Sequence, residues 1–134
     1  MKPFIHAGVS VKKFGGTTND YIQIHDMMDI SKSASADMRH RMLFHHSLGP
    51  YIMETIFGTT ITNSDGKEVS VRDIAEQHIL DDMGGKIPSF DQWVQELNMT
   101  PWMGQPTITK KTFTLQELQN GLTESGQHSN TFLD

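Results

Sequence analysis

The chain contains no cysteine. It therefore forms no disulfide bond and no thiolate zinc site, so any metal site must use histidine, aspartate or glutamate. No apolar run approaches the roughly 18 residues of a membrane-spanning helix, and the first residues lack the pattern of a signal peptide. A net charge of −5 argues against general nucleic-acid binding, which needs a basic excess. These absences predict a cytoplasmic protein that does not associate with membranes.

The 134 residues suffice for one domain with a real core. Their patterns predict a mainly α fold, a compact helical domain of about five helices with one β-hairpin and a flexible C-terminal tail. Helices are expected at 20–32, 37–47, 51–57, 72–83 and 90–97. The hairpin is expected near 59–71, where two β-branched runs flank the turn sequence Asn63-Ser64-Asp65-Gly66. The helical core domain would span 1–104.

The two ends of the chain have their own signals. Val9 and Val11 alternate with polar neighbours, which favours a short extended segment before the Gly15-Gly16 pair. From residue 105 the composition turns rich in Thr, Gln, Ser, Asn and Gly. This predicts a polar C-terminal extension over 105–134 that is at best partly ordered, with one short helix at 114–120.

The segment from Asp37 to Ser47 concentrates three of the seven histidines. Drawn as a helix, it places Arg39 and His46 near the middle of its apolar side, with His40 and His45 at the borders. A buried polar group without a partner costs about 1–3 kcal/mol. We therefore expect these side chains to meet partners from other parts of the chain.

Two other predicted helices supply such partners. His25 lies on the apolar side of the first one, and Asp29 follows one turn later on the same row. Glu76 and His78 lie at the apolar side of the helix at 72–83. A histidine with a carboxylate one turn away is a usable pair of metal ligands.

Histidine and carboxylate donors without cysteine suit a divalent metal such as Zn, Mn, Fe or Ni. The candidate metal ligands are His25, Asp29, His40, His45, His46 and His78. Glu76 would act as general base and Arg39 would hold an anion or phosphate. An open coordination position would activate water, which predicts a metal-dependent hydrolase-like domain.

Two other interpretations of the same residues stay open, so whether the protein is an enzyme is undecided at this point. The cluster could be a structural polar network without cofactor, in which Arg39 forms a buried salt bridge with Asp29 or Glu76. It could also be a metal-free catalytic or phosphate-binding site.

Several short motifs are shared with a known family. They are His6-Ala7, Lys13-Phe14-Gly15-Gly16, Ile24-His25, Asp29, Arg39-His40-Arg41, His45-His46-Ser47, Phe57-Gly58, Thr62-Asn63-Ser64-Asp65-Gly66, Val71-Arg72-Asp73-Ile74, Glu76-Gln77-His78 and Pro101-Trp102-Met103. In these residues the chain resembles a small family of uncharacterised proteins of phages and bacteria, described as a domain of unknown function. The resemblance covers about residues 6–103 and leaves out the tail.

The resemblance implies no activity or ligand. It implies that the tail is an addition and that the gene is of phage or mobile-element origin. A phage protein in the host cytoplasm would favour the alternative function, a host-interaction (anti-defence) protein whose polar cluster is only structural. The sequence leaves a small-molecule ligand, a protein partner and homo-oligomerisation all open.

Overall fold

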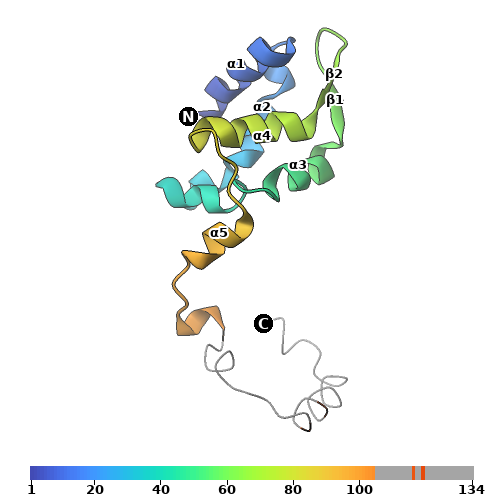
Figure 1. The fold of residues 1–134 in the computed structure, drawn as a ribbon. Coiled ribbons are helices and arrows are strands. Elements are labelled where there is room, and N and C mark those ends of the chain that lie inside the picture. Colours follow the sequence, from blue (N-terminus) through green and yellow to red (C-terminus); the bar gives the residue numbers. More distant parts are fainter. Residues whose placement is uncertain (105–115, 117–118, 120–134) are drawn as a thin grey trace. The chain divides into compact units, whose positions relative to one another are not determined.

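The computed structural model describes residues 1–104 together with Gln116 and Gln119. The chain divides into two compact units, Met1–Glu96 and Leu97–Asp134. Residues 1–104 contain five α-helices and one two-stranded hairpin, which confirms the predicted fold class (Figure 1). The predicted extension at 105–134 and its helix at 114–120 fall mostly outside the described residues. The domain boundary after residue 104 therefore stays a prediction.

The regular elements of the first unit follow one another along the chain with short connections. They are α1 (Pro3–Phe14), α2 (Ile22–Met28), α3 (Gly49–Phe57), β1 (Thr60–Thr62), β2 (Glu68–Ser70), α4 (Val71–Asp82) and α5 (Phe90–Gln95). Four short 3-10 helices complete the list, η1 (Thr18–Asp20), η2 (Ile30–Ser33), η3 (Met38–Met42) and, in the second unit, η4 (Pro101–Met103). None of the helices in the described part combines the length and apolarity that a bilayer crossing requires.

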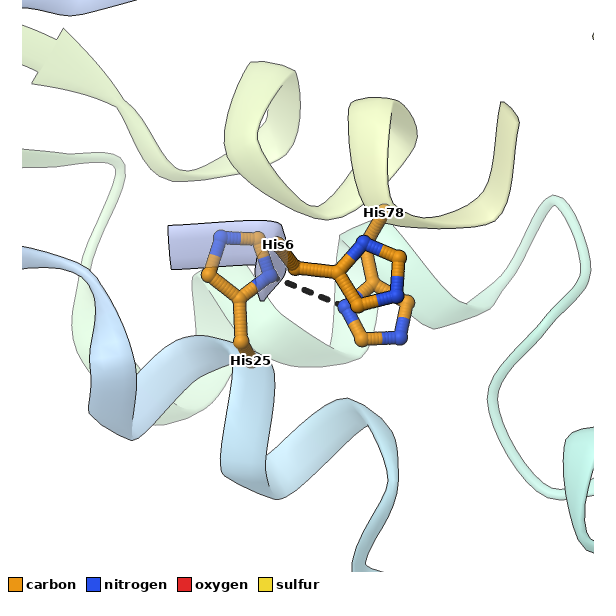
Figure 2. Close-up of side chains that lie close together, drawn as sticks. All are labelled: His6, His25 and His78. Atoms are coloured by element: carbon orange, nitrogen blue, oxygen red, sulfur yellow. Dashed lines mark hydrogen bonds between the residues drawn. The ribbon is translucent and has the colours of Figure 1, made fainter. Parts of the chain in front are cut away.

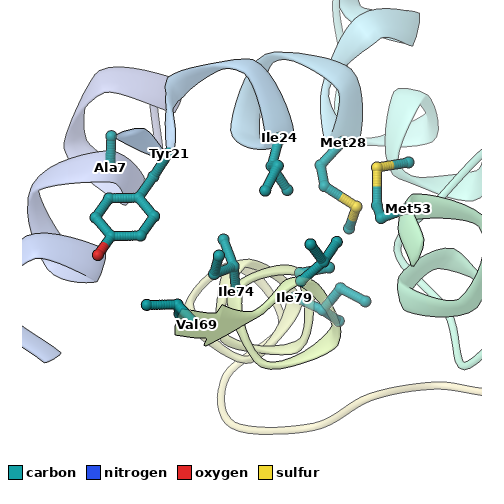
Figure 3. Packing of buried hydrophobic residues seen from close by; sticks show 10 residues of the cluster. Ala7, Tyr21, Ile24, Met28, Met53, Val69, Ile74 and Ile79 are labelled. Carbon is teal, nitrogen blue, oxygen red and sulfur yellow. The ribbon is translucent and has the colours of Figure 1, made fainter. Parts of the chain in front are cut away.

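The hydrophobic core lies around α4, which packs against α1, α2 and α3. Figure 3 shows ten of its buried side chains converging from these helices and from β2. Ile74 and Ile79 of α4 and Met28 of α2 are fully buried. Burying a side chain of this size contributes about 1.5–3 kcal/mol, so this core holds the helices in fixed register around the polar cluster described below.

Residues 1–16 do not form the extended segment that the Val9 and Val11 alternation predicts. They form α1, with Pro3 in its first turn and Lys12 and Lys13 in its last turn, as helix ends favour. The buried side of this helix carries His6, Ala7 and Ser10, which recur at helical spacing. This helix places His6, which is not among the predicted metal ligands, on a buried face.

The segment 37–47 is not the regular helix that its amphipathic pattern predicts. Only Met38–Met42 forms a short 3-10 helix, begun by the Asp37 side chain, which accepts from the Arg39 backbone N–H. The chain then turns irregularly, and the Ser47 N–H donates to the Pro88 carbonyl at 2.9 Å. Met38 is 67% exposed, so the expected apolar side faces solvent for much of its length.

The hairpin forms as predicted, with Ile61 opposite Val69 in an antiparallel register. Asn63 links this turn to the helices. Its side-chain oxygen accepts from the Asp65 and Lys67 N–H groups, and its Nδ2 donates to the Phe14 carbonyl at 3.1 Å. Gly16 has φ +75° and approaches Asn63 so closely that a Cβ would stand 2.9 Å from the Asn63 Cβ.

Candidate metal centre

Helices α1, α2 and α4 together with the segment 38–47 enclose a cluster of imidazoles and carboxylates. Its members are His6, His25, Asp29, His40, His45, His78 and Asp82. The histidines of this cluster are at most 7% exposed, and the Asp29 and Asp82 side chains are each 2% exposed. Figure 2 shows His6 of α1, His25 of α2 and His78 of α4 turned toward one another. A buried histidine and aspartate cluster, predicted from the sequence, is therefore present.

Local spacing explains how α2 and α4 contribute. His25 and Asp29 are one helical turn apart, and so are His78 and Asp82. Each pair therefore projects from one side of its helix, and the packing of α2 on α4 brings the two pairs together. The Oδ1 of Asp29 lies 3.2 Å from the Nε2 of His78 as a result.

The two carboxylates are the centre of the arrangement. Asp29 Oδ1 is also 3.6 Å from His45 Nε2 and 3.7 Å from His40 Nε2. Asp82 Oδ2 lies 2.8 Å from His45 Nε2 and 3.3 Å from His78 Nε2. Its second oxygen, Oδ1, is 3.2 Å from His6 Nε2. Each carboxylate is thus approached by three imidazole nitrogens.

A chain of hydrogen bonds leads from α1 to His78. The Ser10 hydroxyl donates to the His6 carbonyl at 3.2 Å, and the same oxygen lies 2.7 Å from His25 Nε2. His25 Nδ1 lies 2.9 Å from His78 Nδ1 (Figure 2). The ring of His6 stacks on that of His78 with centroids 3.7 Å apart.

Several buried polar atoms of the cluster have no hydrogen-bond partner among the described residues. They are both ring nitrogens of His6, His40 Nε2, His45 Nδ1 and Asp29 Oδ2. The proton position is best defined for His40, because its Nδ1 lies 2.6 Å from the Asp37 carbonyl and must donate to it. In a neutral ring its Nε2 then presents a lone pair toward the Asp29 carboxylate. Such a group costs about 1–3 kcal/mol unless a cation or proton satisfies it.

The surroundings shift the pKa values of the clustered histidines in different directions. Burial lowers the pKa of His25 to about 3, and the neighbouring His78 adds to this effect. Burial also lowers the pKa of His45. For His78, burial acts to lower the pKa, but the hydrogen bonds to Asp29 and Asp82 outweigh it and raise the pKa. The pKa of His78 is therefore shifted in the opposite direction to those of His25 and His45.

Both carboxylates stay ionised. Burial acts to raise the pKa of Asp29, but the hydrogen bond and charge of His78 outweigh it and lower the pKa to about 2. The pKa of Asp82 is lowered more strongly against the same burial effect, because His45, His6 and His78 all contact it. Each carboxylate has one cationic neighbour at 3.3 Å, Lys32 Nζ beside Asp29 Oδ2 and the N-terminal ammonium of Met1 beside Asp82 Oδ1. Two anionic carboxylates in a buried site also attract a metal cation.

The donor atoms are spaced as metal ligands are. The donor atoms of His6, Asp29, His78 and Asp82 all lie within 4.8 Å of one another, and so do those of His6, His25 and His78. Two ligands at about 2.0–2.1 Å from a tetrahedral Zn²⁺ lie roughly 3.3 Å apart. The separations of 3.2 and 3.3 Å from His78 to the two carboxylates match this value.

The structure brings five of the six candidate ligands together and leaves one apart. His25, Asp29, His40, His45 and His78 belong to the cluster. His46 is buried elsewhere: its Nε2 donates to the Leu43 carbonyl at 2.9 Å, and its Nδ1 accepts from the Leu48 N–H at 3.2 Å. Its ring contacts Phe90 edge to face. Both nitrogens are therefore occupied in bonds that shape the turn.

The two candidate catalytic residues lie outside the cluster. Arg39, expected on the inner side of its helix, is 86% exposed and pairs with Asp37 at 2.6 Å, so the buried salt bridge to Asp29 or Glu76 does not form. Glu76 is half-buried and lines a small surface pocket with Lys13, Asp73, Gln77 and Leu80. The expected inward positions of both side chains are wrong, because Arg39 belongs to a solvent-facing 3-10 turn and Glu76 faces away from the row of His78.

Two residues that the sequence analysis missed are central. Asp82 follows His78 by one helical turn, the same signal that singled out His25 and Asp29, and it could have been found by that rule. His6 has no such signal, because no carboxylate follows it one helical turn later. Only the packing of α1 against α4 shows that its ring faces the carboxylates.

A surface pocket of about 380 Å³ reaches the edge of the cluster. Its lining residues are Ser31, Ala34, Ser35, Arg39, His40, Met42, Leu43 and Phe90. His40 is shared by both sites, because the same ring lines the pocket and directs Nε2 at Asp29. The pocket is thus separated from the buried carboxylates by one imidazole.

Fold and site together define a small, mainly α-helical domain with a buried histidine and aspartate cluster. The chain belongs to the family described as Domain of unknown function (DUF6915), whose model matches residues 1–103. This confirms the family resemblance that its motifs suggest. No curated protein and no solved structure matches the chain.

Proposed function

We propose that the cluster binds a divalent metal ion and that the domain acts as a metal-dependent hydrolase. The observation that carries this proposal is the convergence of the seven side chains of the cluster in a buried site where several polar atoms have no hydrogen-bond partner among the described residues. A cation between the two carboxylates satisfies both of them together with the Nε2 lone pairs of His6 and His40, which face them. The mixed nitrogen and oxygen donors suit Zn, Mn, Fe or Ni.

His6, His78, Asp29 and Asp82 are the proposed ligands of the ion. The Nε2 of His6 is 3.2 Å from Asp82 Oδ1 but is not aligned for a hydrogen bond with it. This geometry is what two ligands of one ion adopt, since their lone pairs point at the ion and not at each other. His40 and His45, which approach the same carboxylates, would serve as further ligands or as proton carriers beside the ion.

Hydrolysis requires a bound water and a route for the substrate. A metal of this kind lowers the pKa of a bound water toward neutrality and so supplies a nucleophile. The pocket that His40 lines is the proposed route. Arg39 stands in its wall, and Asp37 occupies its Nε and Nη2 atoms, while Nη1 has no hydrogen bond within the described residues. Nη1 is free to hold an anionic group of the substrate.

The metal-free structural network is the second candidate, and one observation favours it. Hydrogen bonds run without interruption from Ser10 through His25 and His78 to the Asp29 carboxylate, and the His45 to Asp82 contact of 2.8 Å is itself a good hydrogen bond. In that case the cluster would hold α1, α2 and α4 together. The working surface would then be a site for a protein partner, as in a phage-type host-interaction protein.

Metal analysis of protein purified without a histidine tag separates the two candidates. We expect about one ion per chain and a clear fall of the melting temperature after chelation, reversed by reloading. Metal content far below one per chain, with melting unchanged by chelator, contradicts the metal centre. The variant Asp29→Asn should lose the ion, while Asp26→Asn, an exposed carboxylate on the same helix, should retain it.

The catalytic roles are tested on the metal-loaded protein with a panel of chromogenic phosphate and carboxylate esters. Turnover that disappears on chelation supports a hydrolase. Arg39→Gln should raise KM for anionic esters more than for neutral ones. Glu76→Gln tests the general-base assignment, which no contact of Glu76 supports: we expect unchanged metal content and unchanged turnover.

A further inference from the structure

We propose that Ser10 and His25 are positioning residues of the metal centre, forming a hydrogen-bonded relay that turns the Nε2 lone pair of His78 toward the ion. This inference rests on the metal centre proposed above. It assigns His25, a candidate ligand by its position beside His6 and His78, to a supporting role outside the coordination sphere. It also gives a role to Ser10, which neither the sequence nor the donor geometry marks as a ligand.

The direction of the relay follows from the single proton of the Ser10 hydroxyl. That proton is donated to the His6 carbonyl, within the same helix. The Ser10 oxygen can then only accept from His25, so the proton of the His25 ring stands on Nε2. His25 Nδ1 is left as an acceptor, 2.9 Å from His78 Nδ1.

The state of His78 follows in turn. Since His25 Nδ1 accepts, His78 Nδ1 must carry a proton and donate it. The only other ring nitrogen of His78 is Nε2, which lies between Asp29 Oδ1 at 3.2 Å and Asp82 Oδ2 at 3.3 Å. A ring held with its Nδ1 protonated offers the Nε2 lone pair to an ion at this position. Metal-bound histidines commonly donate their other N–H to a fixed acceptor in this way.

His25 itself is poorly placed to act as a ligand. Its Nε2 is engaged by Ser10, and its Nδ1 is engaged by His78. Binding an ion through Nδ1 would break the bond to His78 and leave a buried donor without an acceptor. Both Ser10 and His25 are at most 1% exposed, so water is not at hand to replace the lost bond.

The deciding experiment is NMR of the full chain, labelled with ¹⁵N in its histidines and loaded with ¹¹³Cd²⁺ as the probe. We expect ¹¹³Cd coupling to Nε2 of His78 and none to either nitrogen of His25, whose ring should show the Nε2–H tautomer. Coupling between ¹¹³Cd and His25 would overturn the relay while leaving the metal centre intact. Absence of any bound Cd²⁺ would overturn the metal centre and the relay together.

Metal affinity gives a second readout on the same relay. Ser10→Ala removes the acceptor of His25 and leaves every proposed ligand side chain in place, and we expect Co²⁺ or Zn²⁺ affinity to fall about tenfold, within the range of about 10–100-fold typical of such supporting residues. His25→Gln, which keeps a hydrogen-bonding side chain, should bind the ion more tightly than His25→Phe. Circular dichroism checks that Ser10→Ala is folded, and unchanged metal affinity in this folded variant would contradict the proposal. If either His25 variant fails to fold, the NMR experiment on the wild-type protein decides.

Discussion

The cluster is built from two kinds of backbone. His78 and Asp82 project from α4 and Asp29 caps the C-terminal end of α2, and these two helices pack directly against each other in the core. His40 and His45 come instead from a 3-10 turn and the irregular chain after it. The regular elements place their donors by local spacing, whereas the irregular segment needs anchors from elsewhere in the unit.

Besides the contact of His45 with Asp82, three long-range hydrogen bonds to backbone carbonyls anchor this segment. Trp93 of α5 donates its indole N–H to the His45 carbonyl at 2.9 Å. The Ser47 N–H donates to the Pro88 carbonyl at 2.9 Å, and Arg41 donates to the Asp82 carbonyl at 3.3 Å. We therefore expect a rigid half, which carries the proposed primary ligands, and an adjustable half, which lies between them and the surface pocket. A site that admits a substrate needs this combination of fixed ligands and a side that can give way.

The largest effect should come from breaking the rigid half at Asp82. Asp82→Asn removes the charge that three imidazoles approach, so we expect the metal to be lost and the free energy of unfolding to fall by about 3–5 kcal/mol. Metal content and urea unfolding measure the two effects. A variant that keeps both its ion and its stability would show that Asp82 is not central.

Acid should lower the free energy of unfolding of the metal-free protein, through His25 and Asp29 in the rigid half. The folded pKa of His25 is about 3 against an ordinary value of 6.5, so the unfolded chain takes up a proton that the folded protein does not. Stability should therefore fall as the pH drops from about 6.5 toward 3. Asp29, with a folded pKa of about 2 against 3.8, adds a further loss below pH 3.8.

His78 opposes this trend, because its raised pKa contributes stability below pH 6.5 that is lost as the pH rises through its folded pKa. Urea unfolding in chelator across this range, compared between wild type and His25→Gln, measures the His25 share. Equal acid sensitivity of the two proteins would assign the effect to other groups.

The adjustable half is tested by Gly49→Ala. A Cβ at Gly49 would clash with the Phe44 carbonyl oxygen, so the turn that carries His45 would have to move. We expect a loss of about 1–3 kcal/mol and weaker metal binding. Gly8→Ala is the matched control: in α1 a Cβ at this position meets nothing within 4 Å, and the exchange should stabilise the helix by about 0.5–1 kcal/mol.

The smallest effect is expected from loosening one anchor. Trp93→Phe keeps the aromatic packing of α5 but removes the hydrogen bond to the His45 carbonyl, at a cost of about 1 kcal/mol. Hydrogen exchange should rise at 43–48 and stay unchanged in α4. Increased exchange spread evenly over both halves would mean that the two parts move as one.

Local pattern was enough for the regular parts of the fold. The hairpin, the helix at 72–83 and the cap of α5 at Ser89 all follow from short-range signals, and the structure contains each of them. The helix expected at 37–47 does not form, because no element packs along the whole length of its apolar side. The end of this segment instead forms hydrogen bonds with Pro88 and Trp93, and no local sequence pattern predicts these contacts.

By itself, the sequence determined which donor atoms are available and placed two histidine–aspartate pairs. Without cysteine, only imidazole and carboxylate donors were available, and the spacing of His25 with Asp29 and of His78 with Asp82 sets each pair on one helix face. Tertiary structure alone decided that His6 belongs to the cluster and that Arg39 faces solvent. It also decided that His45 lies in the cluster while its neighbour His46 lies outside it. The physical reason is that helical periodicity relates residues within one turn or two, whereas the choice among buried histidines depends on which segments pack against each other.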